Sequence, residues 1–282
     1  MNAKKLIVYI LCAFLPMIAI GLAVNPANQI LAFVLSTCAM LLPLLAVIIT
    51  QLVFKEPVLK GLDMSFNFNR WWVIGWLLMP VLAMAVLGMT LLMPGAKWAP
   101  DSEMMQTALQ SMPEGFGIWG LIGITMVSGL FSGISINAIF AFGEEIGWRG
   151  YLMKLLKGRK FLLAVLLIGV IWGFWHAPLI LNGHNYPQHP VAGVFMMVLF
   201  CLLLTPMLMY FRIKGGSVIV PAIMHGTFNA VVGITNLVVT PYNDLLYGGP
   251  GLAGMIVLLL VNVGLFLYDR FVSKENVFSS EI

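Results

Sequence analysis

Long apolar runs follow one another along almost the whole chain. Eight runs of roughly 20 residues or more lie at 5–24, 28–52, 71–93, 117–143, 161–181, 191–211, 217–237 and 250–268. An α-helix needs about 20 residues to cross about 30 Å of hydrocarbon, so each run is long enough to span a membrane. A membrane β-barrel would alternate apolar and polar positions, and these runs do not alternate. The pattern predicts an all-α polytopic membrane protein of about eight transmembrane helices.

The composition supports the same class. Of the 282 residues, 61% are hydrophobic and 9% are charged, and the mean hydropathy is +0.98. Soluble globular chains have about 45–50% apolar and about 25% charged residues. These values exclude a water-soluble domain, a disordered chain, a coiled coil and a collagen-like fibre.

The basic residues indicate an orientation. If the N-terminus is cytoplasmic, eight spans leave only Lys97 on the outer side, and 14 of the 15 Lys and Arg residues on the inner side. The inner group is Lys4, Lys5, Lys55, Lys60, Arg70, Arg149, Lys154, Lys157, Arg159, Lys160, Arg212, Lys214, Arg270 and Lys274. Because cytoplasmic loops are enriched in Lys and Arg, this predicts a multi-pass cell-membrane protein with both termini cytoplasmic. The net charge of +4 therefore reports topology, and we expect no nucleic-acid partner.

Two features outside the motifs also give expectations. The longest outer loop, residues 94–116, should contain a short helix near 101–112. Trp71, Trp72 and Trp76 open the third apolar run, where aromatic side chains commonly anchor a helix at the membrane interface.

Ionisable residues within the apolar runs are few and fall in three short segments, at 141–150, 172–178 and 225–229. A charged group at the centre of a membrane costs at least about 2.5–3.5 kcal/mol, so such residues are functional candidates by default. Their concentration in three segments predicts one polar cavity among the helices.

The first segment contains Glu144, Glu145 and Arg149. On a helix Glu145 and Arg149 are four residues apart and face each other, which favours an ion pair. Glu144 is rotated by about 100° and left without that partner, which suits it to act as a general base. In the alternative, both glutamates pair with Arg149 and are structural.

The other two segments place His176 and His225 on two further helices, with Asn229 one turn after His225. A single histidine in an apolar helix is more often a satisfied core residue than a ligand. Together with the carboxylates, however, we expect a joint function. Glu144 lies sixteen residues before Lys160 and His176 sixteen after it, so an antiparallel helix pair would place both at one depth.

Glycines are spaced so that these helices can approach closely. Gly129 and Gly133, and again Gly143 and Gly147, are four residues apart. Small residues at this spacing allow close packing of membrane helices. They explain how polar side chains from three helices could converge.

Three motifs in succession resemble those of the CAAX-protease and bacteriocin-processing (Abi, CPBP) family of intramembrane endopeptidases. The resemblance covers about residues 120–235. Glu-Glu-x-x-x-Arg, Phe-x-x-x-His and His-x-x-x-Asn correspond to Glu144-Glu145-Arg149, to Trp172 and His176, and to His225 and Asn229. Each motif alone is weak, whereas three in order are fairly specific.

The resemblance implies an eight-helix cavity, open to the cytosol and the membrane, in which water attacks a peptide bond. Carried over, Glu144 activates the water and His176 assists or binds it. His225 and Asn229 hold the developing oxyanion, whose stabilisation is often the largest catalytic contribution.

In the same resemblance Glu145 and Arg149 form an orienting pair. Trp172 stands where the family has Phe, and we expect it to change the shape of the cavity without changing the chemistry.

Two alternatives stay open for the attacking water. Glu144, His176 and His225 match the ligands of a catalytic Zn²⁺ site. The soluble metalloprotease signature His-Glu-x-x-His is absent, and a metal-free glutamate mechanism fits the same residues. We slightly favour the metal-free mechanism, with zinc as the alternative cofactor.

The sequence thus predicts a hydrolase, an intramembrane endopeptidase that acts on a membrane-associated peptide or protein and has the lipid bilayer as its other partner. Its short loops and compact length look bacterial. We expect N-terminal transmembrane helices over 1–116, a catalytic core over 117–240, and a last helix with a cytoplasmic tail over 241–282.

Two other classes of function compete with this prediction. A non-catalytic membrane immunity or scaffold protein could bind a peptide in the same cavity, and it would be insensitive to Glu144→Gln. A transporter could use the carboxylates as a proton relay, but the inverted repeats typical of transporters are not visible.

Overall fold

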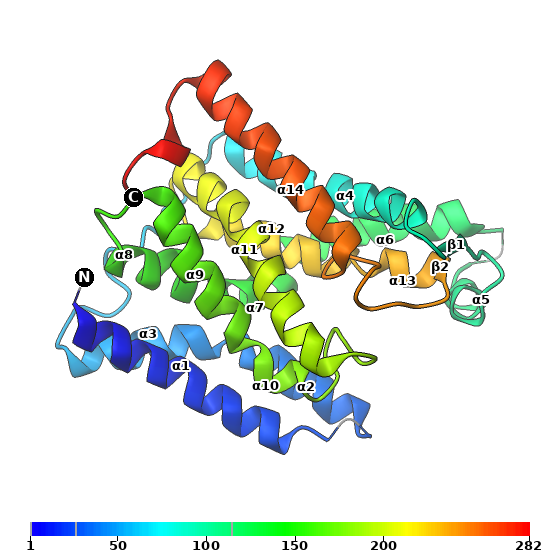
Figure 1. Ribbon diagram of the computed structural model, residues 1–282, viewed down its shortest axis with the longest axis horizontal. Coiled ribbons are helices and arrows are strands. Elements are labelled where there is room, and N and C mark those ends of the chain that lie inside the picture. The colour runs from blue at the N-terminus through cyan, green and yellow to red at the C-terminus, as the bar shows by residue number, and fades with distance from the viewer. Residues whose placement is uncertain (1, 26, 114) are drawn as a thin grey trace.

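The computed structural model describes residues 2–25, 27–113 and 115–282, and its regular structure is almost entirely helical (Figure 1). The elements are α1 (Ala3–Ala23), α2 (Gln29–Ala39), α3 (Leu42–Val53), α4 (Arg70–Leu91), β1 (Lys97–Trp98), α5 (Glu103–Gln110), α6 (Ile118–Gly133), α7 (Ile136–Glu145), a π-helical turn (Ile146–Leu152), α8 (Met153–Leu155), α9 (Phe161–Trp175), α10 (Ala177–Ile180), α11 (Pro190–Gly215), α12 (Ile219–Val231), α13 (Ile234–Val238), β2 (Val239–Thr240), α14 (Leu252–Leu267), a second π-helical turn (Tyr268–Ser273) and a 3₁₀ turn (Val277–Ser279).

Local sequence signals set several helix ends. The side chain of Asn69 accepts a hydrogen bond from the backbone N–H of Trp71 at the start of α4, and Ser102 does the same for Met105 at the start of α5. These side chains satisfy backbone donors that have no partner in the first helical turn. Gly216 follows α11 with a φ of 67°, a conformation that glycine adopts at little cost and that ends the helix.

The prediction of an all-α polytopic membrane protein is confirmed. Within the described residues, six helical segments are long and apolar enough to cross a membrane: Ala3–Ala23, Ile30–Val53, Arg70–Leu91, Phe161–Ile180, Pro190–Gly215 and Leu252–Ser273. A seventh is present if the bent pair Ile118–Gly133 and Ile136–Leu155 is one span. Large apolar side chains are exposed along these helices, as expected for a surface in contact with lipid.

The candidate spans differ from the expected runs at two places. The run at 117–143 is a helix broken between Gly133 and Ile136, bent by 56° and continued to Leu155. The run at 217–237 contains α12, which has 13 residues and ends at Val231, well before 237. Thirteen residues rise about 20 Å, short of the hydrocarbon thickness. Hydropathy alone does not separate such a helix, buried among others, from one that spans the bilayer.

α12 lies in the middle of the helical bundle. It packs against α4, α6, α7 and α11, while α9 packs along α11. The layer of α1 to α3 lies on the other side of α7, and α3 contacts both α7 and the π-helical turn that follows it (Figure 1). α12, which carries the third motif, is therefore an interior element, whereas α7 and α9 bury one face and expose apolar side chains on the other.

The glycines permit close packing, as expected from their spacing. Gly129 and Gly133 face α12, where a Cβ on Gly133 would lie 2.6 Å from Cα of Thr227. Gly143 faces the backbone of the turn between α2 and α3, and Gly147 faces Pro43 at the start of α3 and the hydroxyl of Tyr9. At Gly133 and Gly143 a larger side chain would clash with the backbone of the neighbouring segment.

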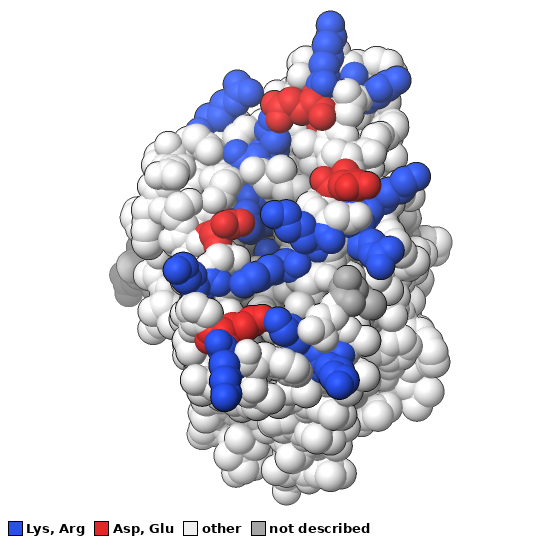
Figure 2. Space-filling view, turned by 90° about the vertical axis from the view of Figure 1, so that its left-hand side faces the viewer, with Lys and Arg blue, Asp and Glu red and all other residues white. Residues whose placement is uncertain are grey.

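Charged side chains gather at one end of the bundle, as Figure 2 shows, and both ends of the described chain lie at that end (Figure 1). Lys4, Lys60, Lys157 and Lys160 are exposed there. Arg149, which we counted with this group from the sequence, is instead fully buried. Arg212 is buried as well, at 8% exposed, and the exposed members of the group form a polarised surface of the kind that the positive-inside bias describes.

The tryptophans at the start of α4 do not all serve as interface anchors. Trp71 and Trp72 are 8% and 5% exposed, and Nε1 of Trp72 donates a hydrogen bond to the carbonyl of Gly215 at 3.1 Å. For these two residues the prediction is wrong, because α4 packs there against the end of α11 and covers both rings.

The outer loop contains the short helix that the sequence predicts, α5 at Glu103–Gln110. The small sheet beside it was not predicted. Its two strands have two residues each, and Lys97 and Trp98 pair antiparallel with Thr240 and Val239. This sheet ties the loop after α4 to the segment after α13.

The packing at Gly133 can be tested by adding one methyl group. We expect Gly133→Ala to lower the stability of the purified protein in detergent by about 1–3 kcal/mol, because overpacking forces helices apart. Gly123→Ala is the matched control on the same helix, since a Cβ there meets nothing within 4 Å. Thermal unfolding followed by circular dichroism would measure both, and equal midpoints would contradict the packing argument.

Candidate functional site

Glu144 and Glu145 are the last two residues of α7, and Arg149 lies in the π-helical turn Ile146–Leu152 that follows directly. π-helical turns are rare and frequently occur at functional sites. All seven residues of this turn are buried. The first motif is thus held inside the bundle on a helix that widens just beyond its two carboxylates.

Glu145 is the hub of a buried network of charges. Its Oε1 lies 3.0 Å from Nη1 of Arg149 and 2.9 Å from Nδ1 of His225. Nη2 of Arg149 donates a hydrogen bond to Oγ1 of Thr205 on α11 at 3.0 Å. The ion pair predicted from the spacing is present, and the network connects α7, α11 and α12.

Glu144 has a different environment from its neighbour. Its Oε2 accepts hydrogen bonds from Nε1 of Trp172 at 2.7 Å and from Nε1 of Trp148 at 3.4 Å. The residue is 2% exposed, and no ion pair involving it is present in the described part of the chain. In the structure only Glu145 pairs with Arg149, so the alternative in which both glutamates pair with it is wrong.

The two histidines are held in the same manner. Nδ1 of His176 lies 2.9 Å from the carbonyl oxygen of Trp172, which can only accept a hydrogen bond, so Nδ1 carries the proton. Nδ1 of His225 faces a carboxylate oxygen of Glu145 and donates to it in the same way. In both rings Nε2 remains for another partner, such as a water molecule or a substrate atom.

The indole of Trp172 lies at the centre of these groups. Its ring is 4.1 Å from Cζ of Arg149, and its centroid is 5.5 Å from that of His225 and 5.8 Å from that of His176. With the hydrogen bond to Glu144, one side chain contacts ionisable residues from all three motifs. The predicted convergence of the three polar segments is present.

Asn229 is the predicted site residue that does not join this cluster. It is exposed, whereas His225, one turn earlier on α12, is 7% exposed. Its side chain makes no hydrogen bond to any of the described residues. The two residues share a helix face, as the spacing predicts, and a joint role in binding one oxygen stays a prediction.

A bound metal ion needs several ligand side chains that point toward one position. Across residues 2–25, 27–113 and 115–282, no three His, Cys, Asp or Glu side chains are arranged as metal ligands. Oε2 of Glu144 is already engaged by two indole donors. Glu144, His176 and His225 therefore do not form a metal-binding set in this arrangement.

Three contributors to the site were missed from the sequence. Trp172 was expected to affect only the shape of the cavity, but its N–H binds Glu144 directly. Trp148 was not considered, although it is four residues after Glu144 and thus on the same helix face. Thr205 could have been noticed as an isolated polar residue in a long apolar run.

Comparison with known proteins agrees with the motifs. Residues 125–231 match the family described as type II CAAX prenyl endopeptidase Rce1-like. The chain is also 30% identical over 142 residues to a CAAX prenyl protease 2 of Methanococcus maripaludis, an alignment that covers 48% of each protein. The matched part is thus about half the length of that curated relative. The family resemblance inferred from the motifs is confirmed for a segment that contains all of them.

The buried network predicts a large loss of stability when its hub is removed. We expect Glu145→Ala to destabilise the purified protein by about 3–5 kcal/mol, because it leaves the Arg149 guanidinium buried without a carboxylate. Glu275→Ala is the control: it removes a carboxylate that pairs with Lys214 and is 55% exposed, so we expect a loss below about 1 kcal/mol. A similar unfolding midpoint for the two variants would argue against a stabilising network.

Proposed function

We propose that the chain is an intramembrane endopeptidase of the CAAX prenyl protease type. The observation that carries the proposal is the environment of Glu144 in the family-matched segment. This buried carboxylate has no basic partner among the described residues and is fixed by two indole donors. Two histidines nearby keep Nε2 for further contacts. A carboxylate held in this way is suited to take a proton from water.

In the proposed reaction Glu144 takes a proton from a water molecule as the water oxygen attacks the carbonyl carbon of the peptide bond. Nε2 of His176 accepts the other hydrogen of that water in a hydrogen bond and so orients it. As the C–N bond breaks, the protonated Glu144 gives its proton to the leaving amine. One peptide bond and one water molecule become a carboxylic acid and an amine.

The negative charge that develops on the carbonyl oxygen needs hydrogen-bond donors close by. Nε2 of His225 takes this role when the ring is doubly protonated, and the side-chain amide of Asn229 can add a second donor. Glu145 then balances the charge on the His225 ring. With Glu144 and Arg149 also charged, two negative and two positive groups leave the cluster neutral, which limits the cost of burying it.

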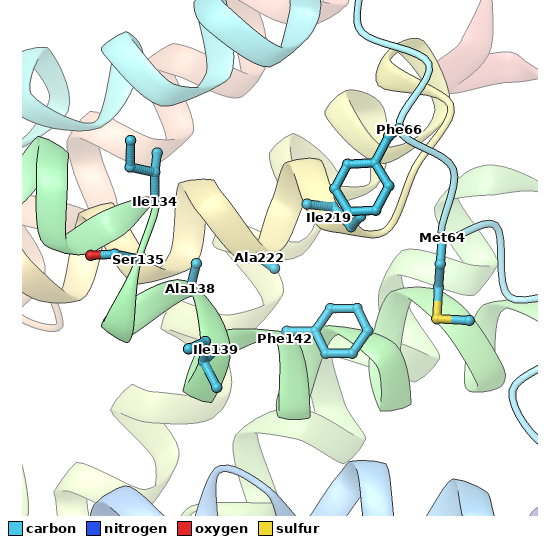
Figure 3. A pocket seen from close by; sticks show the side chains of 9 residues that line it. All are labelled: Met64, Phe66, Ile134, Ser135, Ala138, Ile139, Phe142, Ile219 and Ala222. Atoms are coloured by element: carbon cyan, nitrogen blue, oxygen red, sulfur yellow. The ribbon is translucent and has the colours of Figure 1, made fainter.

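An apolar cavity on the two helices that carry Glu144 and His225 is suited to the apolar part of a substrate. Its volume is about 360 Å³, and it lies between α7, α12 and the loop before α4 (Figure 3). Its lining residues are Met64, Phe66, Ile134, Ser135, Ala138, Ile139, Phe142, Ile219 and Ala222. Phe142 is two residues before Glu144, and Ala222 is three before His225. We assign to this cavity a prenyl group carried by a membrane-associated peptide or protein substrate.

The orientation follows from the charged end of the bundle. We place this end, with both ends of the chain, on the cytoplasmic side, because cytoplasmic loops are enriched in Lys and Arg. The substrate then presents its peptide bond from that side while its apolar group stays in the bilayer.

The first experiment needs no assumption about the substrate. Newly formed protein termini would be compared in membranes of cells that express wild type, Glu144→Gln or the exposed-site control Glu103→Gln at matched levels. We expect termini that appear with wild type and with Glu103→Gln. With Glu144→Gln we expect their yield to fall by about 10²–10⁴-fold, a typical contribution of a general base. Identical profiles from three folded proteins would favour the alternative function of a peptide-binding immunity or scaffold protein.

The role of the cavity can be tested with a farnesylated peptide that ends in a Cys-aliphatic-aliphatic-X sequence, the signal for prenylation. Because Ala138→Leu reduces the space in the cavity, we expect it to slow cleavage of this peptide by at least about tenfold. Ser135→Ala is the control: its hydroxyl donates to the backbone of Phe131 at 2.7 Å, and its loss leaves the cavity open. Equal cleavage by both variants would place the prenyl group elsewhere.

A further inference from the structure

We propose that Trp172 is a positioning residue: its indole N–H holds the Glu144 carboxylate away from Arg149, so that the two adjacent glutamates keep different roles. The proposal rests on the function proposed above, because it concerns the base of that reaction. It also goes beyond the family motif, in which this position is Phe. A phenyl ring has no N–H, so it could not make this contact.

The site contains two carboxylates that could both bind the same guanidinium. Glu144 and Glu145 are adjacent, and the nearest guanidinium is that of Arg149. If both carboxylates turned toward Arg149, neither would be left to act on water. In the structure, Oε1 of Glu145 pairs with Nη1 of Arg149 at 3.0 Å. Oε2 of Glu144 instead accepts a hydrogen bond from Nε1 of Trp172 at 2.7 Å. The helical rotation of about 100° between the two residues favours this division, and the bond from Trp172 is placed to maintain it.

Trp172 contacts both Glu144 and Arg149. Its N–H donates to Oε2 of Glu144, while its ring lies against the guanidinium of Arg149, with 4.1 Å from the ring centroid to Cζ. A cation over an indole face is stabilised by the ring and loses access to other groups from that side. The same side chain thus binds one carboxylate and covers the cation that would compete for it.

The other buried indoles show that this contact is unusual in the chain. Nε1 of Trp72 donates to the carbonyl of Gly215, and Nε1 of Trp175 donates to the carbonyl of Ala13, both at 3.1 Å. Those bonds satisfy a backbone acceptor and join two helices. The bond from Trp172 ends on an ionisable side chain and is 2.7 Å long, as expected for a hydrogen bond to a charged acceptor. Trp148 donates to the same oxygen at 3.4 Å, a much weaker contact.

The functional test compares Trp172→Phe with Trp72→Phe in the terminus experiment. Both variants lose one buried indole N–H and the same volume, so Trp72→Phe controls for the loss of a buried indole. We expect Trp172→Phe to lower the yield of wild-type-dependent termini by about 10–100-fold, the range found for residues that orient the ligands of a catalytic metal. Trp72→Phe should stay within about threefold of wild type.

A spectroscopic test examines the contact itself and does not depend on activity. In protein labelled with ¹⁵N-tryptophan, the Trp172 indole signal is the one lost in Trp172→Phe. We expect Glu144→Ala to move this proton resonance upfield by more than it moves any other indole resonance, because a strong acceptor is removed. Glu275→Ala, which removes an exposed carboxylate, should leave it in place.

The outcomes separate the two proposals. If wild type and Glu144→Gln give the same termini, the endopeptidase proposal fails, and the positioning role fails with it. If wild type is active but Trp172→Phe matches Trp72→Phe, only the role of Trp172 is refuted. An unmoved indole resonance in Glu144→Ala would refute the hydrogen bond, whatever the activities.

Discussion

The structure depends on one constraint: charged groups that lie inside a bundle of membrane helices must find partners within the bundle. In a medium of low polarity an unpaired charge is costly, and removal of one member of a buried pair leaves the other uncompensated. Glu145 meets this requirement for two groups at once, because the same oxygen contacts Arg149 and His225. Since Arg149 also reaches Thr205, this carboxylate fixes the relative positions of α7, α11 and α12. The rest of the site is arranged around that fixed point.

Because Glu145 meets the structural need, Glu144 is released from it. The contrast between the two glutamates comes from their surroundings, since they are identical in type and adjacent in sequence. One is held by the guanidinium of Arg149 and the imidazole of His225, and the other by the N–H groups of two indole rings. Such a division of two like residues into a structural and a chemical role is a common way to obtain one reactive group in a buried site. In the proposed reaction this division rests on a helix end, a π-helical turn and a tryptophan from a neighbouring helix.

Much of this was predictable from the sequence, and the failures have physical causes. The helical class followed from the length of the apolar runs, and the pair of Glu145 and Arg149 followed from their spacing on a helix. The short α12 was taken as a span because its interior position makes it as apolar as a lipid-facing helix. The exposure of Asn229 and the N–H contact of Trp172 depend on how one helix is rotated against another. A pattern read along a single helix carries no such information.

The break between α6 and α7 has a consequence for how a membrane-anchored substrate of the proposed reaction would reach the protein. Ile134 and Ile139, which line the cavity beside this break, are 45% and 64% exposed, on a surface that lipid would cover. A molecule anchored in the same bilayer would reach this opening by lateral diffusion in two dimensions. The rate of encounter would then follow its surface density, as a mole fraction of the lipid, and not its concentration in the surrounding water. Added lipid or detergent would dilute the substrate, even with the amounts of both proteins unchanged.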